Sequence, residues 1–124
     1  VMSKLNRVLA RFGLEMGVQA EPWALRFSGR PTLLLSASER FRCGFCFQIS
    51  VGTLTGAKLA IVDGVDILDQ TNRRILFEVA TKAVEAGMVD QIILTATPST
   101  DALPKSTSTC DVYQLTRSGE IERV

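Results

Sequence analysis

The sequence contains no histidine among its 124 residues. The chain therefore supplies no imidazole for a Ser-His-Asp triad, a Cys-His dyad or a metal site with a histidine ligand. It also has no apolar run of about 18 residues, the length that a membrane-spanning helix requires. The N-terminal residues lack the layout of a signal peptide. We therefore expect a cytoplasmic protein with no membrane partner.

An excess of charge of one sign and an even set of cysteines are also absent. The formal net charge is +1, so the composition does not indicate wholesale nucleic-acid binding by this segment alone. Three cysteines do not form a disulfide framework and are typical of a reducing compartment. Apolar residues make up 46% of the chain, which indicates a folded core rather than disorder. We expect residues 1–124 to form a single domain.

A phosphate-binding P-loop of the form GxxxxGK[ST] is missing. In such a loop, backbone amides cradle the phosphates, the lysine neutralises them and the hydroxyl binds Mg²⁺. The nearest string is GTLTGAK at residues 52–58. Its spacing is different, no Ser or Thr follows Lys58, and it precedes an apolar run instead of opening a helix. This segment is therefore not expected to bind phosphate.

The apolar pattern that is present predicts an α/β sheet domain. The predicted helices cover 4–14, 36–54 and 71–86, the predicted strands cover 24–28, 32–35, 59–62 and 91–95, and a terminal hairpin joins 112–116 to 121–124. The unbroken run at 59–62 is typical of a strand buried on both faces of a parallel sheet. Asp63 follows this run directly, so we expect it at the C-terminal end of a central strand.

Two segments carry features that suit phosphate and Mg²⁺. In LSASERFR, at 35–42, Ser36 precedes a predicted helix and Glu39 follows three residues later, as in a capping box. The amides and the dipole at such a helix start attract anions. In KLAIVDGVDILD, at 58–69, the apolar run ends in Asp63, and a carboxylate at the end of a buried strand can hold Mg²⁺ directly or through water. The simpler alternatives are a plain helix cap and a plain strand-end aspartate.

In this order, about one helix apart, the two segments resemble the signature motif, Walker B strand and D-loop of ABC-type ATPases. The closer match is the branch of structural-maintenance-of-chromosomes (SMC) proteins, SbcC and RecF. The resemblance covers nearly the whole chain. It implies an α/β, parallel-sheet P-loop-NTPase half domain, namely the C-terminal lobe of an ABC ATPase head, with a terminal β-hairpin. The Walker A lobe would then be N-terminal in the same protein, of which this chain is a part or a natural split half.

The resemblance also implies a function and partners. The parent protein would bind ATP with Mg²⁺, dimerise through two ATP-bound heads, and clamp or remodel DNA in repair, recombination or chromosome maintenance. The signature turn, which contacts the γ-phosphate of ATP on the opposite subunit, would consist of Ser36, Ala37, Ser38 and Glu39. Asp63 would assist Mg²⁺, and Asp69 would act across the dimer interface.

The family pattern is LSGGE, so Ala37 and Ser38 replace two glycines and leave the backbone less free to approach a ligand. Arg40 and Arg42 could face the nucleotide or DNA, or could be solvated charges.

Gly64 is the main departure from the family pattern. Related ATPases usually place at this position a glutamate that polarises the attacking water. Asp66, two residues further on, is the candidate for that catalytic role here. The alternative is a degenerate, ATP-gated dimerisation module that does not hydrolyse ATP. The switch histidine of transporter-type relatives is also missing, at a position near Ala96.

A second alternative is a thiol oxidoreductase, which would rest on the CGFC string of Cys43 and Cys46. A redox pair of this kind should open a helix, where the helix dipole lowers the thiol pKa. Here the pair lies inside a predicted apolar helix, which favours buried core cysteines. A zinc site would need about two more soft ligands, and only Cys110 remains.

Overall fold

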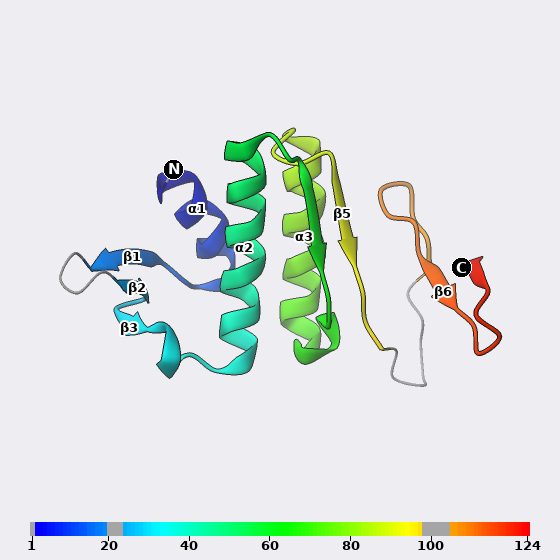
Figure 1. The fold of residues 1–124 in the computed structure, drawn as a ribbon, viewed down its shortest axis with the longest axis horizontal. Helices are drawn as coiled ribbons and strands as arrows, with labels where there is room; N and C mark the ends of the chain where they lie inside the picture. The colour runs from blue at the N-terminus through cyan, green and yellow to red at the C-terminus, as the bar shows by residue number, and fades with distance from the viewer. Residues whose placement is uncertain (1, 20–23, 98–104) are drawn as a thin grey trace.

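The computed structural model describes residues 2–19, 24–97 and 105–124 of an α/β chain. The elements are α1 (Met2–Leu9), η1 (Ala10–Phe12), β1 (Met16–Gln19), β2 (Ala24–Phe27), β3 (Arg30–Pro31), η2 (Thr32–Leu34), α2 (Ala37–Thr55), β4 (Leu59–Val62), η3 (Val65–Ile67), α3 (Gln70–Glu85), β5 (Gln91–Leu94), β6 (Tyr113–Leu115) and β7 (Ile121–Arg123). The long helices α2 and α3 lie side by side, with β4 and β5 beside them (Figure 1).

The centre of the chain is a parallel β-α-β unit. Strands β4 and β5 pair in register from Leu59 with Gln91 to Val62 with Leu94, and α3 forms the connection between them. Parallel strands require a long crossover of this kind, because a tight turn cannot return the chain to the same end of the sheet. The predicted strands at 59–62 and 91–95 and the predicted helix at 71–86 are confirmed within one residue.

The expectation that β4 is a central strand buried on both faces is wrong for this chain. Ala60 and Val62 are buried, whereas Leu59 and Ile61 are 45% and 55% exposed. Among the described strands, β4 pairs only with β5. The run of apolar residues is continuous, but the described helices cover only one face of the two-stranded sheet. The other face, with Leu59, Ile61 and Ile93, is open, and we call it the open sheet face.

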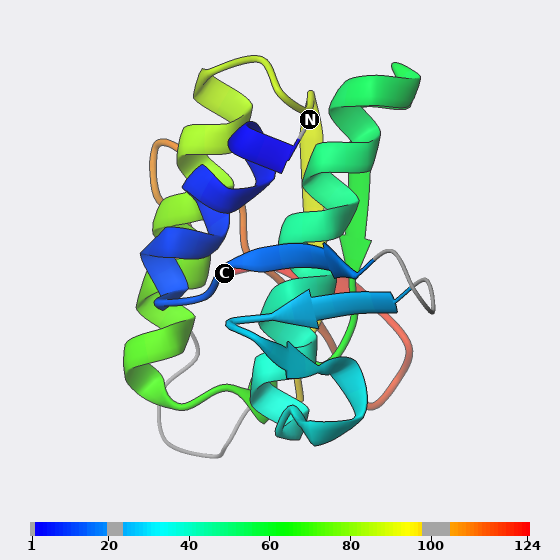
Figure 2. The same cartoon turned by 90° about the vertical axis from the view of Figure 1, so that its left-hand side faces the viewer.

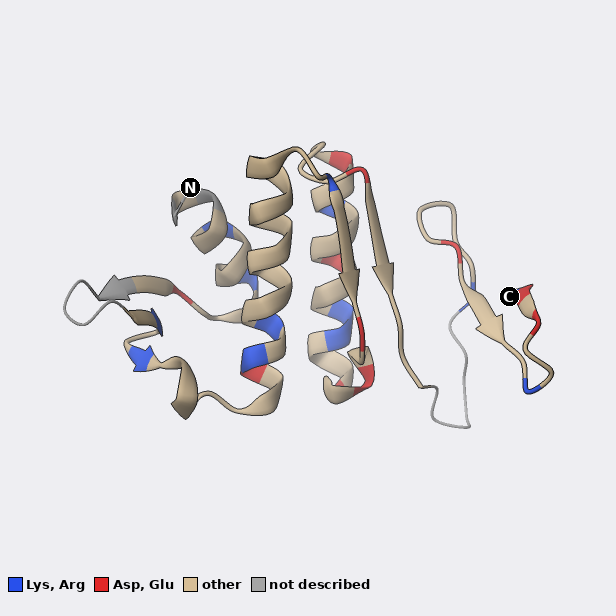
Figure 3. Cartoon of the chain, viewed as in Figure 1, with Lys and Arg blue, Asp and Glu red and all other residues tan. Residues whose placement is uncertain are grey.

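Helix α2 begins and ends at the predicted signals. Ser36 and Glu39 form the capping box, and Gly56 ends the helix in the left-handed conformation at φ 71°. Its charged residues lie only in the first two turns, and residues 43–55 carry no charge. Figure 3 shows this uncharged length of α2, whereas the charges of α3 are spread along the whole helix. Phe47 and Leu54 are exposed on it, although a solvent-facing helix surface is usually polar.

The N-terminal part differs most from the prediction. The helix expected over 4–14 is shorter, because α1 ends at Leu9 and continues as the 3-10 turn η1 up to Gly13, which has φ 69°. An antiparallel sheet of β1, β2 and β3 follows (Figure 2), and β1 was not predicted. The predicted strand at 32–35 is wrong: Thr32–Leu34 form the 3-10 turn η2, with Leu33 88% exposed.

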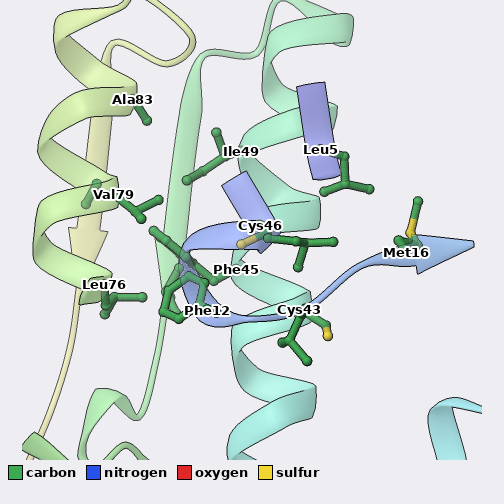
Figure 4. Packing of buried hydrophobic residues seen from close by; sticks show 14 of the residues in the cluster. Leu5, Phe12, Met16, Cys43, Phe45, Cys46, Ile49, Leu76, Val79 and Ala83 are labelled. Atoms are coloured by element: carbon green, nitrogen blue, oxygen red, sulfur yellow. The ribbon is translucent and has the colours of Figure 1, made fainter. Parts of the chain in front are cut away.

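One hydrophobic cluster holds α1, α2 and α3 together (Figure 4). Leu5 and Leu9 from α1 are fully buried with Cys46 and Ile49 from α2 and Leu76 from α3. Most of the stability of helices of this length comes from such packing rather than from helix propensity. This core fixes α2 and α3 relative to β4, and therefore fixes the loops at their ends.

The terminal hairpin is confirmed as β6 and β7, which pair from Tyr113 with Arg123 to Leu115 with Ile121. Leu115 and Ile121 are both exposed. Within the described residues, no helix has the length and apolar character needed to cross a membrane. The division of the chain into a single domain stays a prediction.

Candidate functional site

The carboxyl ends of β4 and β5 and the N-termini of α2 and α3 lie at the same end of the β-α-β unit (Figure 1). This follows from the topology, because short connections join α2 to β4 and β4 to α3. Ligands of open parallel sheets bind at this end. The acidic residues that the sequence singled out, Asp63, Asp66 and Asp69, all lie in the segment between β4 and α3. We call this end the strand-end edge.

Asp63 follows the C-terminal end of β4, so its predicted place at a strand end is confirmed, but β4 is not the predicted central strand, because among the described strands it pairs only with β5. One of its carboxylate oxygens, Oδ1, accepts a hydrogen bond from the hydroxyl of Thr95, the residue that follows β5. The backbone carbonyl of Thr95 accepts hydrogen bonds from the amides of Gly64 and Val65, at 3.1 Å and 3.0 Å. Asp63 is exposed to solvent. Its carboxylate is therefore held in place but open to a ligand.

Gly64 adopts the left-handed conformation, with φ 83° and ψ 40°. A Cβ placed there would contact nothing within 4 Å, so the conformation rather than space explains the glycine. A side chain in the left-handed region costs roughly 1–2 kcal/mol. A glutamate at this position, as in the ATPases that the sequence resembles, would therefore be strained in this turn.

Asp66 lies in the 3-10 turn η3, and its Oδ1 accepts a hydrogen bond from the amide of Thr97 at 3.2 Å. Its own carbonyl accepts one from Nη2 of Arg73 at 3.0 Å. Arg73 also donates through Nε to the carbonyl of Leu68 at 2.7 Å. Asp66 thus connects the loop after β4 to the loop after β5, and its carboxylate is exposed at the strand-end edge.

Asp69 caps α3. Its Oδ1 accepts a hydrogen bond from the backbone amide of Asn72 at 2.8 Å, and its Oδ2 accepts one from Nδ2 of Asn72 at 2.9 Å. These bonds, above all the one from the backbone amide, hold the pKa of the Asp69 carboxyl below its usual value. Asp69 is therefore the N-cap of this helix.

Ser36 is the N-cap of α2. Its hydroxyl accepts a hydrogen bond from the amide of Glu39 at 3.1 Å, and the Glu39 carboxylate accepts one from the amide of Ser36 at 2.8 Å. Arg30 forms an ion pair with Glu39. The hydrogen bond from Arg30, followed by the one from the Ser36 amide, lowers the pKa of Glu39 to about 2. Ala37 is exposed in the first turn, and Ser38 is half-buried behind it.

Arg42 has contacts that the sequence interpretation missed. Its Nε donates to the carbonyl of Ser38 at 3.2 Å, and its Nη1 donates to the carbonyl of Phe12 at 3.3 Å and to Oδ1 of Asn72 at 3.1 Å. Its guanidinium carbon lies 5.9 Å from the centroid of the Phe12 ring. Arg42 therefore joins α2 to η1 and α3 through hydrogen bonds, whereas Arg40, two residues before it, is exposed. No spacing signal pointed to this, because two of the three acceptors are thirty residues away.

The donor set for a metal ion at the strand-end edge is small. Within residues 2–19, 24–97 and 105–124, no group of three His, Cys, Asp or Glu side chains could hold a metal ion. Asp63 supplies one carboxylate, with the Thr95 hydroxyl beside it. Mg²⁺ bound through one or two carboxylates usually takes its other ligands from water and phosphates. The residues present therefore fit Mg²⁺ that arrives with a nucleotide, and do not fit a site that binds the ion alone.

Cys43 and Cys46 are buried inside α2. Burial raises the pKa of the Cys43 thiol to about 11 and raises that of Cys46 further. A reactive redox pair needs the opposite, because the thiolate is the nucleophile. The third cysteine, Cys110, is half-buried shortly before β6. The structural basis for a thiol oxidoreductase is therefore lost.

The GTLTGAK string is not a phosphate-binding loop. Gly52 lies buried in the last part of α2, where an added Cβ would come within 3.3 Å of Val89 Cγ1. The string ends in the short loop before β4 and lies at the opposite end of β4 from Asp63. A shallow groove runs between this part of α2 and β4, lined by Phe47, Gln48, Val51, Gly52, Thr55, Ala57 and Leu59.

Comparison with protein-family models found no match, and comparison with curated proteins found none either.

Proposed function

We propose that this chain is the C-terminal lobe of an ATPase head of the SMC, SbcC and RecF type, from a protein that acts on DNA in repair, recombination or chromosome maintenance. The observation that carries the proposal is the position of Asp63. It ends a parallel strand at the same end of the β-α-β unit where the Ser36-capped helix begins. The order of these two features along the chain is the order of the signature and Walker B motifs in the resembled family.

The chemistry at each position suits the role. The free amides at the start of α2 can bind an anionic phosphate, because the helix dipole and the unpaired donors both favour negative charge there. In the proposed dimer, this turn of one head contacts the γ-phosphate of ATP bound to the other head. The Asp63 carboxylate assists the Mg²⁺ that accompanies ATP in its own head. The Walker A lobe supplies the P-loop that this chain lacks.

The open sheet face and the groove beside it support a missing lobe. Leu59 and Ile61 are about half exposed, and β4 has one edge without a strand partner among the described residues. Residues 43–55 of α2 carry no charge, and Phe47 and Leu54 are exposed among them. Parallel sheets are normally covered on both faces. The N-terminal lobe of the same protein is the occupant that the proposal assigns to this surface.

Hydrolysis in this proposal depends on Asp66. Asp66 would orient the attacking water, and its carboxylate also accepts a hydrogen bond from the backbone amide of Thr97. A second candidate function is therefore a head that binds ATP and dimerises without hydrolysing it. The left-handed conformation of Gly64 favours this reading, because the turn disfavours the usual glutamate at this position.

The test uses the full-length protein that carries this segment. Ser36→Arg should abolish ATP-dependent dimerisation, measured by analytical ultracentrifugation, because a long cation replaces the cap at the phosphate-binding turn. ATP binding to a single head should persist. Ser118→Arg, in the turn between β6 and β7, is the matched control and should leave dimerisation unchanged. If Ser36→Arg dimerises normally with ATP, Ser36 is only a helix cap and the proposal fails.

A further inference from the structure

We propose that Arg42 is a positioning residue that couples the Ser36 turn to the Asp69 turn. The functional role of this coupling rests on the proposed function, in which both turns face the partner head. The coupling itself is a property of the folded chain without nucleotide. It is a connection between two helix N-termini that are separate in the sequence and meet at the strand-end edge.

On the α2 side, Arg42 is bound to the first turn of the helix. Its Nε donates to the carbonyl of Ser38 at 3.2 Å. Ser38 lies inside the capping box that Ser36 and Glu39 form. A displacement of the capped turn therefore moves the Ser38 carbonyl and the guanidinium that is bound to it.

On the α3 side, Arg42 fixes the orientation of one amide group. Its Nη1 donates to Oδ1 of Asn72 at 3.1 Å, and Nδ2 of the same amide donates to Oδ2 of Asp69 at 2.9 Å. The amide oxygen must face the cation and the amide nitrogen must face the carboxylate. A rotation of the Asn72 amide would break both bonds. Asn72 therefore transmits the position of Arg42 to the Asp69 carboxylate.

Two further residues, Phe12 and Arg73, hold this connection rigid. The carbonyl of Phe12 accepts a hydrogen bond from Nη1 of Arg42 at 3.3 Å, and the Phe12 ring lies beneath the guanidinium. From the other side, Arg73 binds the carbonyls of Asp66 and Leu68. The Asp69 turn is thus anchored by one arginine from α2 and one from α3. Partly buried hydrogen-bond chains of this kind strengthen one another.

Arginine is required because the planar guanidinium reaches three acceptors on three elements at once. The single ammonium group of a lysine cannot reproduce that fork. Arg42→Lys keeps the positive charge but removes the planar guanidinium that makes the three hydrogen bonds. Arg40→Lys makes the same change at a nearby exposed residue. The pair of variants separates the geometry of the connection from its charge.

The experiment is a double-mutant cycle of Ser36→Ala and Asp69→Ala, measured by urea unfolding of the nucleotide-free chain, in three backgrounds. In the wild-type and Arg40→Lys backgrounds, the unfolding equilibrium constant of the double mutant should differ from the product of the single effects by at least about twofold. In the Arg42→Lys background, the two effects should multiply within error. A purely structural role of Arg42 would lower stability but would not remove this interaction.

If Arg42→Lys does not fold, Asn72→Ala provides the same test, because it keeps Arg42 and removes the connecting amide. Independent effects of Ser36→Ala and Asp69→Ala in the wild-type background would overturn the proposal. So would an interaction that survives Arg42→Lys, since charge alone would then be sufficient. Because no ATP is present, either result leaves the dimerisation test of the proposed function to stand or fail separately.

Discussion

The hydroxyl of Thr95 donates a hydrogen bond to Oδ1 of Asp63, across the ends of two parallel strands. The carbonyl of Thr95 binds the two amides that follow Asp63, and its amide donates to the carbonyl of Val62 at 2.9 Å. One residue after β5 therefore sets both the backbone of the turn after β4 and the direction of the Asp63 carboxylate. The candidate magnesium ligand depends on a neighbour that the Walker B-like segment does not contain.

The first prediction concerns this hydrogen bond. Thr95→Val keeps the shape of the side chain and removes the hydroxyl, so the free energy of unfolding should fall by about 1 kcal/mol, the order of one hydrogen bond at a solvated site. Urea unfolding measures the change. Thr97→Val is the matched control: Thr97 is exposed and its bond to Asp66 uses the backbone amide, so its effect should stay within about 0.5 kcal/mol. Equal losses in the two variants would show that the Thr95 hydroxyl does not stabilise the turn.

The second prediction concerns pH. The pKa of Glu39 falls from its ordinary 4.5 to about 2 in the folded chain, chiefly because of the hydrogen bond from Arg30. Between these two values the unfolded state binds more protons than the folded state, so the contribution of Glu39 to stability is present above pH 4.5 and is lost as the pH falls toward 2. The pKa values of Asp69 and Glu78 are lowered too, and these residues add to the same trend.

The variant that tests this is Glu39→Gln, because glutamine keeps the capping box and removes the titration. The urea midpoint of the variant should decrease less steeply than that of the wild type as the pH is lowered through this window. Glu85→Gln, which removes an exposed carboxylate in the last turn of α3, is the matched substitution for comparison. Identical slopes for Glu39→Gln and the wild type would contradict the pKa assignment.

The third prediction compares two glycines with open space around them. Gly64 has φ 83°, whereas Gly44 lies exposed in the interior of α2. Gly64→Ala should destabilise the chain by roughly 1 kcal/mol, because alanine is strained in the left-handed region. Gly44→Ala should stabilise it by roughly 0.5–1 kcal/mol, because alanine is the better helix former. Thermal unfolding of the two variants should therefore shift in opposite directions, and a shift in the same direction would contradict the assigned backbone of the turn.

The fourth prediction concerns thiol reactivity. The pKa of Cys43 is raised from 9.0 to about 11, so its thiolate fraction near neutral pH is roughly 100-fold smaller than that of an ordinary cysteine. A colorimetric disulfide reagent should label Cys110 rapidly, and should label Cys43 and Cys46 only on unfolding. Cys110→Ser should remove the rapid phase. Rapid labelling of all three thiols in the native chain would reopen the oxidoreductase alternative.

The sequence predicted well wherever a short-range signal determined the structure. The capping pattern of Ser36 and Glu39 and the position of Gly56 gave both ends of α2. The apolar runs at β4 and β5 and the helical spacing between them gave the β-α-β unit. These elements are specified by local backbone preferences and by the period of the apolar residues. Asp63 at a strand end and Ser36 at a helix start followed directly from them.

The parts that the sequence did not predict depend on contacts between distant residues. Whether β4 is covered on one face or two depends on which elements pack against it, and the apolar run is the same in both cases. Strand β1 exists because it pairs with β2, and Thr32–Leu34 become a 3-10 turn although their composition suits a strand. The contacts of Arg42 with Phe12 and Asn72 also arise only once three elements are assembled.

The uncharged half of α2 and the open sheet face also govern the colloidal behaviour of the chain. An exposed strand edge beside aliphatic side chains is a template for adding a strand from another molecule. With a formal net charge of +1, electrostatic repulsion between copies is weak. The isolated chain should therefore form soluble oligomers and then precipitate as it is concentrated. Lysine substitutions at Leu59 and Ile61, two half-exposed positions on the open sheet face, should delay precipitation without unfolding the chain.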